Sequence, residues 1–389
     1  MAYEFDNLPN RAGTKSLKWE VGEGELAMWV ADMDFAVAPE IYEALKNRLE
    51  ERVYGYSVLD EQWENAYTSW WKRRHNYEIK KGSLTYAGGT LAAINSLIRK
   101  LSAPGENVVI LTPVYNCFFY CIKNMGRNTL SCELRYEEGE YFIDWGNLEF
   151  CLKDPQTSLL LLCNPHNPIG RTLRKDELMR IGELCEKYGV IVISDEVHCD
   201  ITEPGINYTP FAAASEVCAG LSANIIAATK AFNIAGLQTA AVFTPNPKLH
   251  KKVSRALNGD DIAEPSFFGL IAAICAFERG EAWLEEMRAY VSANRKFANE
   301  FIARELPKVR SVAQNATYLM WLDVSGYCDE GTKLAKFIRQ KTGLFLSHGA
   351  QYGKGGEKFL RLNIATSRKN VIDGLSRLKT ALDLWEGQI

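Results

Sequence analysis

The chain lacks long apolar runs, an excess of charge of one sign, and a secretory leader pattern. None of its apolar runs approaches the ~18 residues of a membrane-spanning helix, so a membrane protein is not expected. Its 45 Lys and Arg residues nearly balance 48 Asp and Glu residues, and the net charge of −3 gives no reason to expect nucleic acid or an anionic membrane as a partner. Residues 1–13 are polar and partly acidic, unlike a signal peptide. We therefore expect a cytoplasmic protein.

Metal-binding and disulfide patterns are also missing, although the chain has 10 cysteines. No C-x-x-C pair occurs, Cys117 and Cys121 are four residues apart, and the others are scattered singly, many of them in apolar runs. The five histidines do not cluster with the cysteines in the sequence, so we expect no zinc site and no other metal. The pattern is typical of reduced, buried thiols in a cytosolic protein.

What the sequence does contain, from about residue 84, is an alternation of short apolar runs with helical patterns. Continuous apolar runs are typical of parallel strands that are covered on both faces. After about residue 286 a long helical stretch precedes several alternating strands and a C-terminal helix. We predict an α/β fold with two domains: a large one, residues 45–285, with a mainly parallel sheet flanked by helices, and a smaller α+β one made of residues 1–44 and 286–389.

Polar or glycine-rich segments follow four of the apolar runs. In open α/β sheets, ligands bind beyond the carboxyl ends of the strands. One such coincidence carries little weight, but four in one domain predict one site. The segments are Gly88-Gly89-Thr90, the stretch NPHNPIG at 164–170, the stretch DEVH at 195–198, and Thr229-Lys230.

Each segment has an ordinary interpretation and a chemical one. The glycine pair is either a plain turn capped by Thr90 or a phosphate cradle, because glycines allow close backbone approach and a helix N-terminus offers free N–H groups. Asp195 is either a cap or salt-bridge partner, or the partner of a protonated pyridine nitrogen. His198 is either a structural histidine or lies beside that acid. Lys230 is either a solvated lysine or a nucleophile that bonds covalently through its amine.

Arg361 lies in the last predicted strand, on the face opposite to that of Leu360 and Leu362. Its guanidinium is suited to bidentate capture of a carboxylate, and a surface ion pair is the alternative. The glycine-rich stretch 349–356 looks superficially like a P-loop. However, the spacing of its glycines is one residue too short and no Ser or Thr follows its lysine.

Together and in this order, these segments resemble the pyridoxal-phosphate (PLP) enzymes of the aspartate aminotransferase fold, called fold type I. The match covers nearly the whole chain, and the spacings of 35 residues from Asp195 to Lys230 and 131 residues from Lys230 to Arg361 suit the family. The resemblance implies that PLP is the cofactor and that Lys230 bonds to it and later moves the substrate's α-proton. It also implies that Asp195 pairs with the pyridine nitrogen, Asn167 binds the phenolic oxygen, Tyr115 stacks on the ring, and Arg361 binds the substrate carboxylate.

The phosphate-binding part matches the family only in part. The resemblance assigns the phosphate to the backbone at Gly89 and Thr90 and to Thr229. Many family members have an arginine where this chain has Gln238, and a tyrosine where it has His198. We expect His198 to lie beside the cofactor.

The departures, with the stretches WVADMDF at 29–35 and VYGYS at 53–57, resemble the cystathionine β-lyase branch, the C–S lyases that include cystalysin. This implies a homodimer with shared active sites, in which Tyr56 reaches the partner subunit's phosphate. It implies α,β-elimination of L-cystathionine and other cysteine S-conjugates to a thiol, pyruvate and ammonia. An aminotransferase is the alternative. A regulator with this fold would need a DNA-binding domain, and too few residues precede Trp29 for one. Regulatory binding through the enzyme surface stays open.

Overall fold

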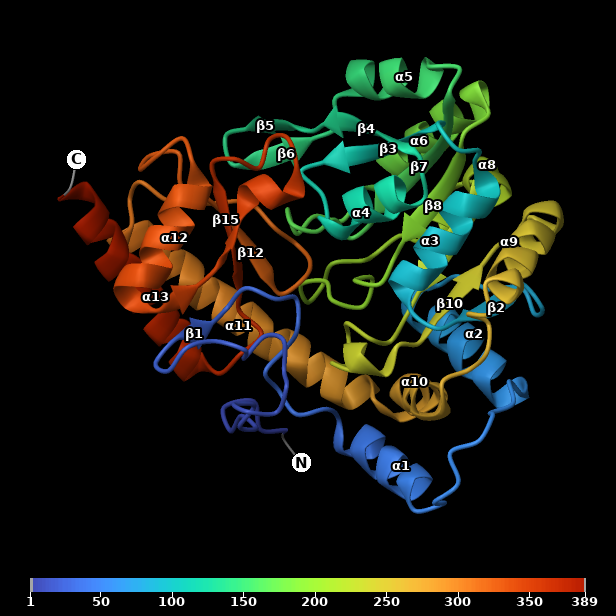
Figure 1. Cartoon of the computed structure of the whole chain (residues 1–389), viewed down its shortest axis with the longest axis horizontal. Coiled ribbons are helices and arrows are strands. Elements are labelled where there is room, and N and C mark those ends of the chain that lie inside the picture. The colour runs from blue at the N-terminus through green and yellow to red at the C-terminus, as the bar shows by residue number, and fades with distance from the viewer. Residues whose placement is uncertain (1–2, 388–389) are drawn as a thin grey trace.

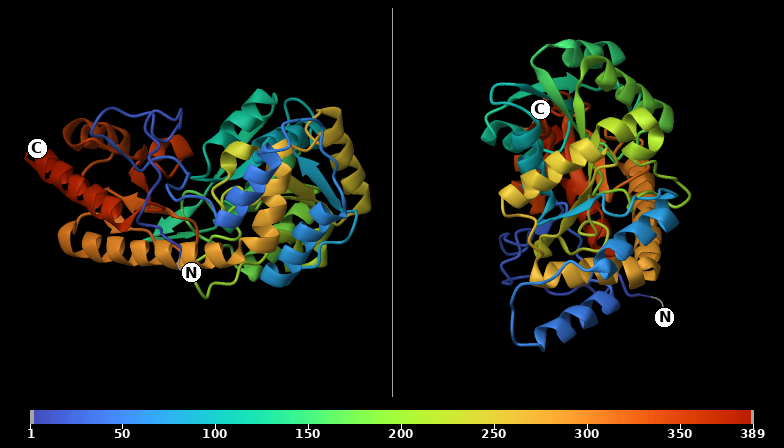
Figure 2. Two further views of the ribbon diagram at one scale, coloured as in Figure 1. Left: turned by 90° about the horizontal axis from the view of Figure 1, so that it is seen from below. Right: turned by 90° about the vertical axis from the view of Figure 1, so that its right-hand side faces the viewer.

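The computed structural model describes residues 3–387 and contains two main sheets, one on each side of the molecule (Figure 1). A seven-stranded sheet with its helices forms the larger part, and a four-stranded sheet with the C-terminal helices forms the smaller one. Helix α11 (Glu281–Glu305) runs beneath both parts (Figure 2). It starts at Glu281 rather than near residue 286, where the sequence pattern changes character.

The large sheet is mainly parallel, as predicted. Only β10 runs antiparallel to its neighbours β2 and β9. The alternation of apolar runs and helices did not reveal β10. Its chain returns from β9 through a turn and the short helix η1 (Ala235–Leu237), so no long crossover marks it. The spatial order is β2 (Leu84–Ala87), β10 (Ala240–Phe243), β9 (Ser222–Ile226), β8 (Ile191–Asp195), β7 (Thr157–Cys163), β3 (Asn107–Thr112) and β4 (Asn128–Glu133).

Both faces of this sheet are buried, which explains the continuous apolar runs. Successive side chains of a strand point to opposite faces. On β3, Val108 and Ile110 therefore pack into the core beneath α3 and α9, whereas Val109 and Leu111 pack into the core beneath α5 and α6. The covering helices are α2 (Glu61–His75), α3 (Thr90–Leu101), α4 (Cys117–Asn124), α5 (Trp145–Lys153), α6 (Lys175–Tyr188), α7 (Phe211–Ala214), α8 (Glu216–Leu221), α9 (Pro247–Gly259) and α10 (Phe267–Arg279).

The smaller part is built on an antiparallel sheet whose strands lie in the order β11 (Arg310–Ser311), β12 (Leu319–Asp323), β15 (Phe359–Asn363) and β14 (Ser347–His348). The N-terminal segment joins it, since β1 (Leu26–Ala27) pairs in parallel with β13 (Leu344–Phe345). The remaining elements are α1 (Pro39–Leu49), the hairpin β5 (Arg135–Glu137) and β6 (Glu140–Phe142), α12 (Gly331–Thr342), η2 (Gly349–Tyr352) and α13 (Arg368–Glu386).

Burial of the cysteines follows the sequence prediction, and all ten are free thiols. Cys117 and Cys328 are partly exposed, and the other eight are buried. Within residues 3–387, no helix combines the length and the apolar character that a bilayer crossing requires.

Candidate active site

Three of the predicted segments meet at the carboxyl ends of neighbouring strands. In the sheet register, Asp195 at the end of β8 lies between Cys163 of β7 and Ile225 of β9. Backbone hydrogen bonds continue the ladder past the strand ends, since Asn164 N–H donates to Asp195 O at 3.0 Å and Glu196 N–H donates to Ile225 O at 2.9 Å. Parallel pairing therefore brings the stretches 164–170, 195–198 and 229–230 to one edge.

The charged groups of Asp195 and Lys230 lie at this edge of the sheet, where solvent access is low. Asp195 is buried, and among residues 3–387 its side chain accepts one hydrogen bond, a long one of 3.3 Å from Val197 N–H. Burial raises the pKa of Asp195 to about 7, although the backbone bond and the charge of Lys230 oppose the shift. Burial also lowers the pKa of Lys230, whose amine donates to Ala31 O at 2.8 Å. The site therefore holds an acid that forms no ion pair within residues 3–387 and an amine whose pKa is lowered.

Arg361 reaches the same place from β15 of the smaller part, as its strand face predicted. Its Nη1 donates to Asn167 Oδ1 at 3.0 Å, and its Nη2 donates to Trp29 O at 2.8 Å. The guanidinium lies 4.9 Å from the ring centroid of Tyr352. Its Nε is buried and has no hydrogen-bond partner within residues 3–387. Two of its five N–H donors are thus used, so Arg361 is fixed in orientation and keeps donors for a ligand.

The predicted phosphate cradle has no space for a side chain. Gly89 precedes the first residue of α3, Thr90, and has a φ of 124°, which favours glycine. A Cβ at Gly89 would lie 2.8 Å from Gln238 Oε1, so Gln238 does lie against the cradle, as its position relative to Lys230 implied. Thr229 is buried directly before Lys230. The first turn of α3 supplies the free N–H groups.

Two aromatic rings complete this group. Burial raises the pKa of Tyr115, and the neighbouring Cys117 thiol raises it further. Burial also lowers the pKa of His198 to about 3, with the charges of Lys230 and Arg361 acting in the same direction. The His198 ring is therefore neutral, lies edge-on to Tyr318 and leaves Nδ1 without a partner.

The N-terminal stretch 29–33, here called the strap, crosses over the site, and the strand-end pattern did not place it there. Its backbone carbonyls accept from Lys230 and Arg361, and Asn363 Nδ2 donates to Val30 O and Asp32 O at 2.6 and 2.8 Å. The carboxylate of Asp32 raises the pKa of Lys230 in opposition to burial. The strap has no periodicity, so only its unusual acidic and aromatic composition could have marked it.

One predicted site residue lies apart from the rest. Tyr56 is on the connection between α1 and α2 and its side chain is 98% exposed. No hydrogen bond or ring contact of Tyr56 occurs within residues 3–387. Within a single chain, Tyr56 therefore lies away from the other predicted site residues.

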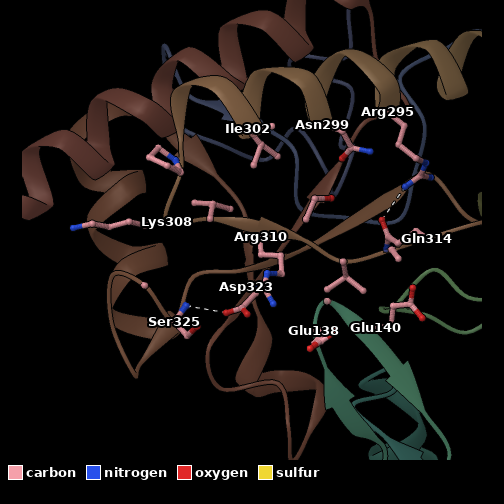
Figure 3. Close-up of a pocket in the computed structure, with 18 residues that line it drawn as sticks. Glu138, Glu140, Arg295, Asn299, Ile302, Lys308, Arg310, Gln314, Asp323 and Ser325 are labelled. Carbon is pink, nitrogen blue, oxygen red and sulfur yellow. Dashed lines mark hydrogen bonds between the residues drawn. The ribbon is translucent and has the colours of Figure 1, made fainter.

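A separate hollow of about 820 Å³ lies between the β5–β6 hairpin, β11 and α11 (Figure 3). Its lining includes Arg295, Asn299, Gln314 and Asp323. None of the site residues predicted from the sequence lines it, so the two places are distinct.

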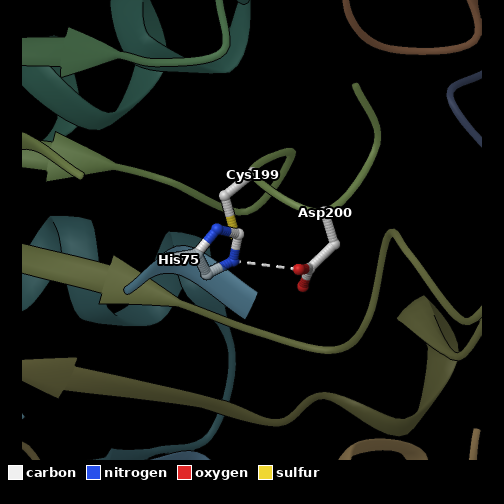
Figure 4. A group of neighbouring side chains, drawn as sticks. All are labelled: His75, Cys199 and Asp200. Atoms are coloured by element: carbon white, nitrogen blue, oxygen red, sulfur yellow. Dashed lines mark hydrogen bonds and ion pairs between the residues drawn. The ribbon is translucent and has the colours of Figure 1, made fainter. Parts of the chain in front are cut away.

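One histidine lies beside a cysteine in the fold although the two are far apart in the sequence. Folding brings His75 of α2 beside Cys199 and Asp200 (Figure 4). The potential ligand atoms of these three buried residues lie within 4.8 Å of one another. The expectation that the chain binds no metal stays a prediction.

The residues of the main site fit PLP. A protonated ring nitrogen would supply the cation that Asp195 lacks, and a phosphate would accept from the N–H groups beside Gly89. The site thus combines a buried acid at the end of a strand, a low-pKa lysine, a glycine-lined helix N-terminus and a free guanidinium donor. A mainly parallel sheet with this arrangement defines the class of fold type I enzymes.

The chain belongs to the aminotransferase class I and II family, whose sequence model matches residues 28–378. It is 38% identical over 384 residues to the cystathionine beta-lyase PatB of Bacillus subtilis (strain 168), covering 97% of this chain and 99% of the relative. The solved structure of cystalysin from Treponema denticola, which contains pyridoxal 5'-phosphate, superposes with a TM-score of 0.94 at 32% identity and covers 98% of this chain and 99% of that one. The PLP-bound C–S lyase of Staphylococcus hominis gives 0.92 at 30% identity, with 98% of each chain covered.

Proposed function

We propose that this protein is a PLP-dependent C–S β-lyase that converts L-cystathionine and other cysteine S-conjugates to a thiol, pyruvate and ammonia. From cystathionine the thiol is homocysteine. The likeness to named cystathionine β-lyases over nearly the full length supports this reaction. The observation that carries it in the structure is Arg361, which two hydrogen bonds hold in orientation at the site and which keeps N–H donors for one carboxylate.

Arg11 illustrates why a dicarboxylate substrate fits less well. It lies beside the strap, but its Nη2 bonds Asp32 at 2.6 Å and its Nη1 bonds Met33 O at 2.9 Å. Its guanidinium is therefore engaged within the protein. A transaminase that uses a dicarboxylic keto acid would need a second guanidinium available for the distal carboxylate.

Bound PLP supplies a positively charged ring that stabilises negative charge at the substrate's α-carbon. Asp195 would keep a proton on the ring nitrogen, because the pair of opposite charges would offset the cost of burying the carboxylate. Tyr115 would stack on the ring, and Asn167 would donate to the phenolic oxygen. The backbone at Gly89 and Thr90, with Thr229, would hold the phosphate.

Lys230 and Arg361 carry the substrate steps. Arg361 binds the α-carboxylate and so fixes which α-substituent faces Lys230. The Lys230 amine, whose pKa burial lowers, would accept the α-proton. The electron pair of the broken C–H bond forms the double bond to the β-carbon, and the C–S pair leaves with sulfur as a thiolate. Water then releases the three-carbon remainder as pyruvate and ammonia.

The phosphate carries about two negative charges near neutral pH, and Gln238 is neutral. We propose that a second copy of the chain completes the site, with Tyr56 donating to the phosphate in its partner subunit. The full exposure of Tyr56 in the single chain supports this.

We also propose a cytoplasmic location and a division of the chain into two domains, residues 45–285 and residues 1–44 with 286–389. The boundary between residues 285 and 286 falls inside α11.

The test is incubation of the purified protein with L-cystathionine, following pyruvate and amino transfer separately. We expect pyruvate to form without an added keto acid, and much faster than amino transfer to 2-oxoglutarate. Fast transfer with only trace pyruvate would replace this proposal with an aminotransferase.

A further inference from the structure

Asp200 is a buried carboxylate outside the site, and it is held by three side chains of α2. Trp70 Nε1 lies 3.1 and 3.2 Å from its two oxygens, His75 Nε2 lies 3.0 Å from Oδ1, and Arg74 Nε lies 3.3 Å from the same oxygen. Burial opposes the charge, yet His75 and Arg74 hold the pKa of Asp200 below its usual range. Asp200 is therefore an anion, and the side chains of α2 already use most of the lone pairs of its two oxygens.

This arrangement argues against a metal ion, although a Cys, a His and an Asp are together suited to zinc (Figure 4). The Arg74 guanidinium already lies where it neutralises Asp200. Burial and the neighbouring Asp200 raise the pKa of the Cys199 thiol, whereas zinc requires the thiolate. The cluster is better explained as an anchor between α2 and the segment that contains Cys199 and Asp200.

That segment connects Asp200 to the site. Residues 195–200 follow β8 without a break, and two backbone turns link them: Cys199 N–H donates to Glu196 O at 3.0 Å, and Ile201 N–H donates to His198 O at 2.9 Å. Asp195 is at the sheet end of the segment, and Asp200 is at the other end. A displacement of Asp200 therefore moves a short and tightly turned segment that also contains His198.

We propose that Asp200 is a positioning residue, which through its bonds to α2 holds Asp195 where it meets the ring nitrogen of the cofactor. This role rests on the proposed use of PLP, and Asp200 itself would not contact the cofactor. The sheet fixes the backbone of Asp195, but its carboxylate accepts a 3.3 Å hydrogen bond from Val197 N–H, which belongs to this segment, so the orientation of the carboxylate depends on the segment.

The experiment titrates PLP into the cofactor-free Asp200→Asn variant and compares it with an analogue whose ring nitrogen is replaced by carbon. The analogue keeps the phosphate and the aldehyde but does not use Asp195. We expect the Kd for PLP to rise about 10-fold, a typical effect of removing a group that orients a ligand-binding residue. The Kd for the analogue should stay within about 2-fold of the wild-type value, and the absorption band of bound PLP should shift.

Glu203→Gln is the matched control, since Glu203 forms a 2.7 Å ion pair with Arg295 beyond the anchor. It should leave both Kd values unchanged. Equal weakening of PLP and the analogue in Asp200→Asn, or no weakening of either, would overturn the inference. If Asp200→Asn fails to fold, Trp70→Phe removes one donor and is judged by the same criteria. A wild-type chain that binds neither compound would instead contradict the proposed cofactor.

Discussion

Lys230 and Asp195 are opposite charges in one site, yet each is shifted by burial toward its neutral form. An ordinary salt bridge would shift both the other way. The difference arises because neither forms an ion pair with the other, and Lys230 donates to a backbone carbonyl instead. Within residues 3–387, neither side chain therefore has an oppositely charged group in direct contact.

Replacement of Lys230 by Ala should abolish covalent cofactor attachment and essentially all turnover. Reduction of the wild-type protein with borohydride should fix the cofactor to Lys230, as peptide mapping by mass spectrometry would show. Lys187→Ala serves as the control, because Lys187 is exposed and pairs with Glu149 away from the site. Full activity of Lys230→Ala would refute the assignment.

Asp195→Asn should stabilise the cofactor-free protein at high pH while it weakens PLP binding. Burial raises the pKa of Asp195 in the folded protein to about 7, from an ordinary value of 3.8. A raised pKa contributes stability below the unfolded value, and that contribution is lost as pH rises through the folded value. The gain from the substitution should therefore be small near pH 4 and grow up to about pH 7, at ~1.4 kcal/mol for each pKa unit.

Chemical unfolding of both cofactor-free proteins between pH 4 and 8 measures this difference. A gain that is independent of pH would contradict the buried-charge interpretation.

At the scale of elements, the site is assembled from pieces that are far apart in the chain. The strap, the ends of β7, β8 and β9, and β15 each contribute, and the strap is bonded to β15 through Arg361 and Asn363. Arg361 thus depends on the strap for one of its two orienting bonds.

Removing the amide of Asn363 should loosen the strap. Asn363→Ala loses two hydrogen bonds to strap carbonyls, each worth ~1 kcal/mol, so we expect the KM for an S-conjugate to rise about 10-fold. Steady-state pyruvate formation measures it. Asn128→Ala, which removes one exposed bond to Gly105 O, should leave KM unchanged. Equal kinetics for the two variants would show that the strap does not hold Arg361.

The connection between α1 and α2 provides a second prediction. Tyr56→Phe should weaken PLP retention by about 10- to 150-fold, because a hydrogen bond to a charged group is worth ~1.5–3 kcal/mol. Tyr54→Phe is the control: its hydroxyl donates to Leu49 O, and its ring packs on Phe267. Dialysis followed by absorbance of the remaining cofactor measures retention. Unchanged retention in Tyr56→Phe would count against a shared site.

For the whole molecule, the apolar side chains that remain exposed are concentrated in one place. The stretch 49–59 contains Val53 at 73%, Tyr56 at 98% and Val58 at 79% exposure, and it stands out from the body of the fold beside α1 (Figure 2). An exposed apolar patch of this kind marks an interaction surface. The occupant that we propose is a second copy of the chain, because it would also supply a phosphate donor through Tyr56.

Val58→Glu should therefore produce a folded monomer with poor cofactor retention. The side chain is exposed in the single chain, so its replacement should not affect the core, but a buried charge at the interface would oppose association. Sedimentation of wild type and variant measures the assembly, and Ile372→Glu on the exposed face of α13 is the control. A wild-type protein that sediments as an active monomer would contradict the shared site.

The sequence by itself determined the parts of this protein that depend on local pattern. Continuous apolar runs predicted buried parallel strands, because both faces of the large sheet are covered. The residues after these runs predicted a site that contains Gly89, Asn167, Asp195 and Lys230, since parallel strands place their carboxyl ends at one edge. Burial of most cysteines followed from their apolar neighbours.

Only the tertiary structure decided the features that depend on contacts between distant segments. It placed the strap over Lys230, reversed β10, and brought His75 to Cys199 and Asp200. No local pattern encodes these contacts, because each forms only when independently folded elements pack together. The pKa shift of Asp195 belongs to the same group: the sequence placed the acid at the strand end, but the packing around it removed its water.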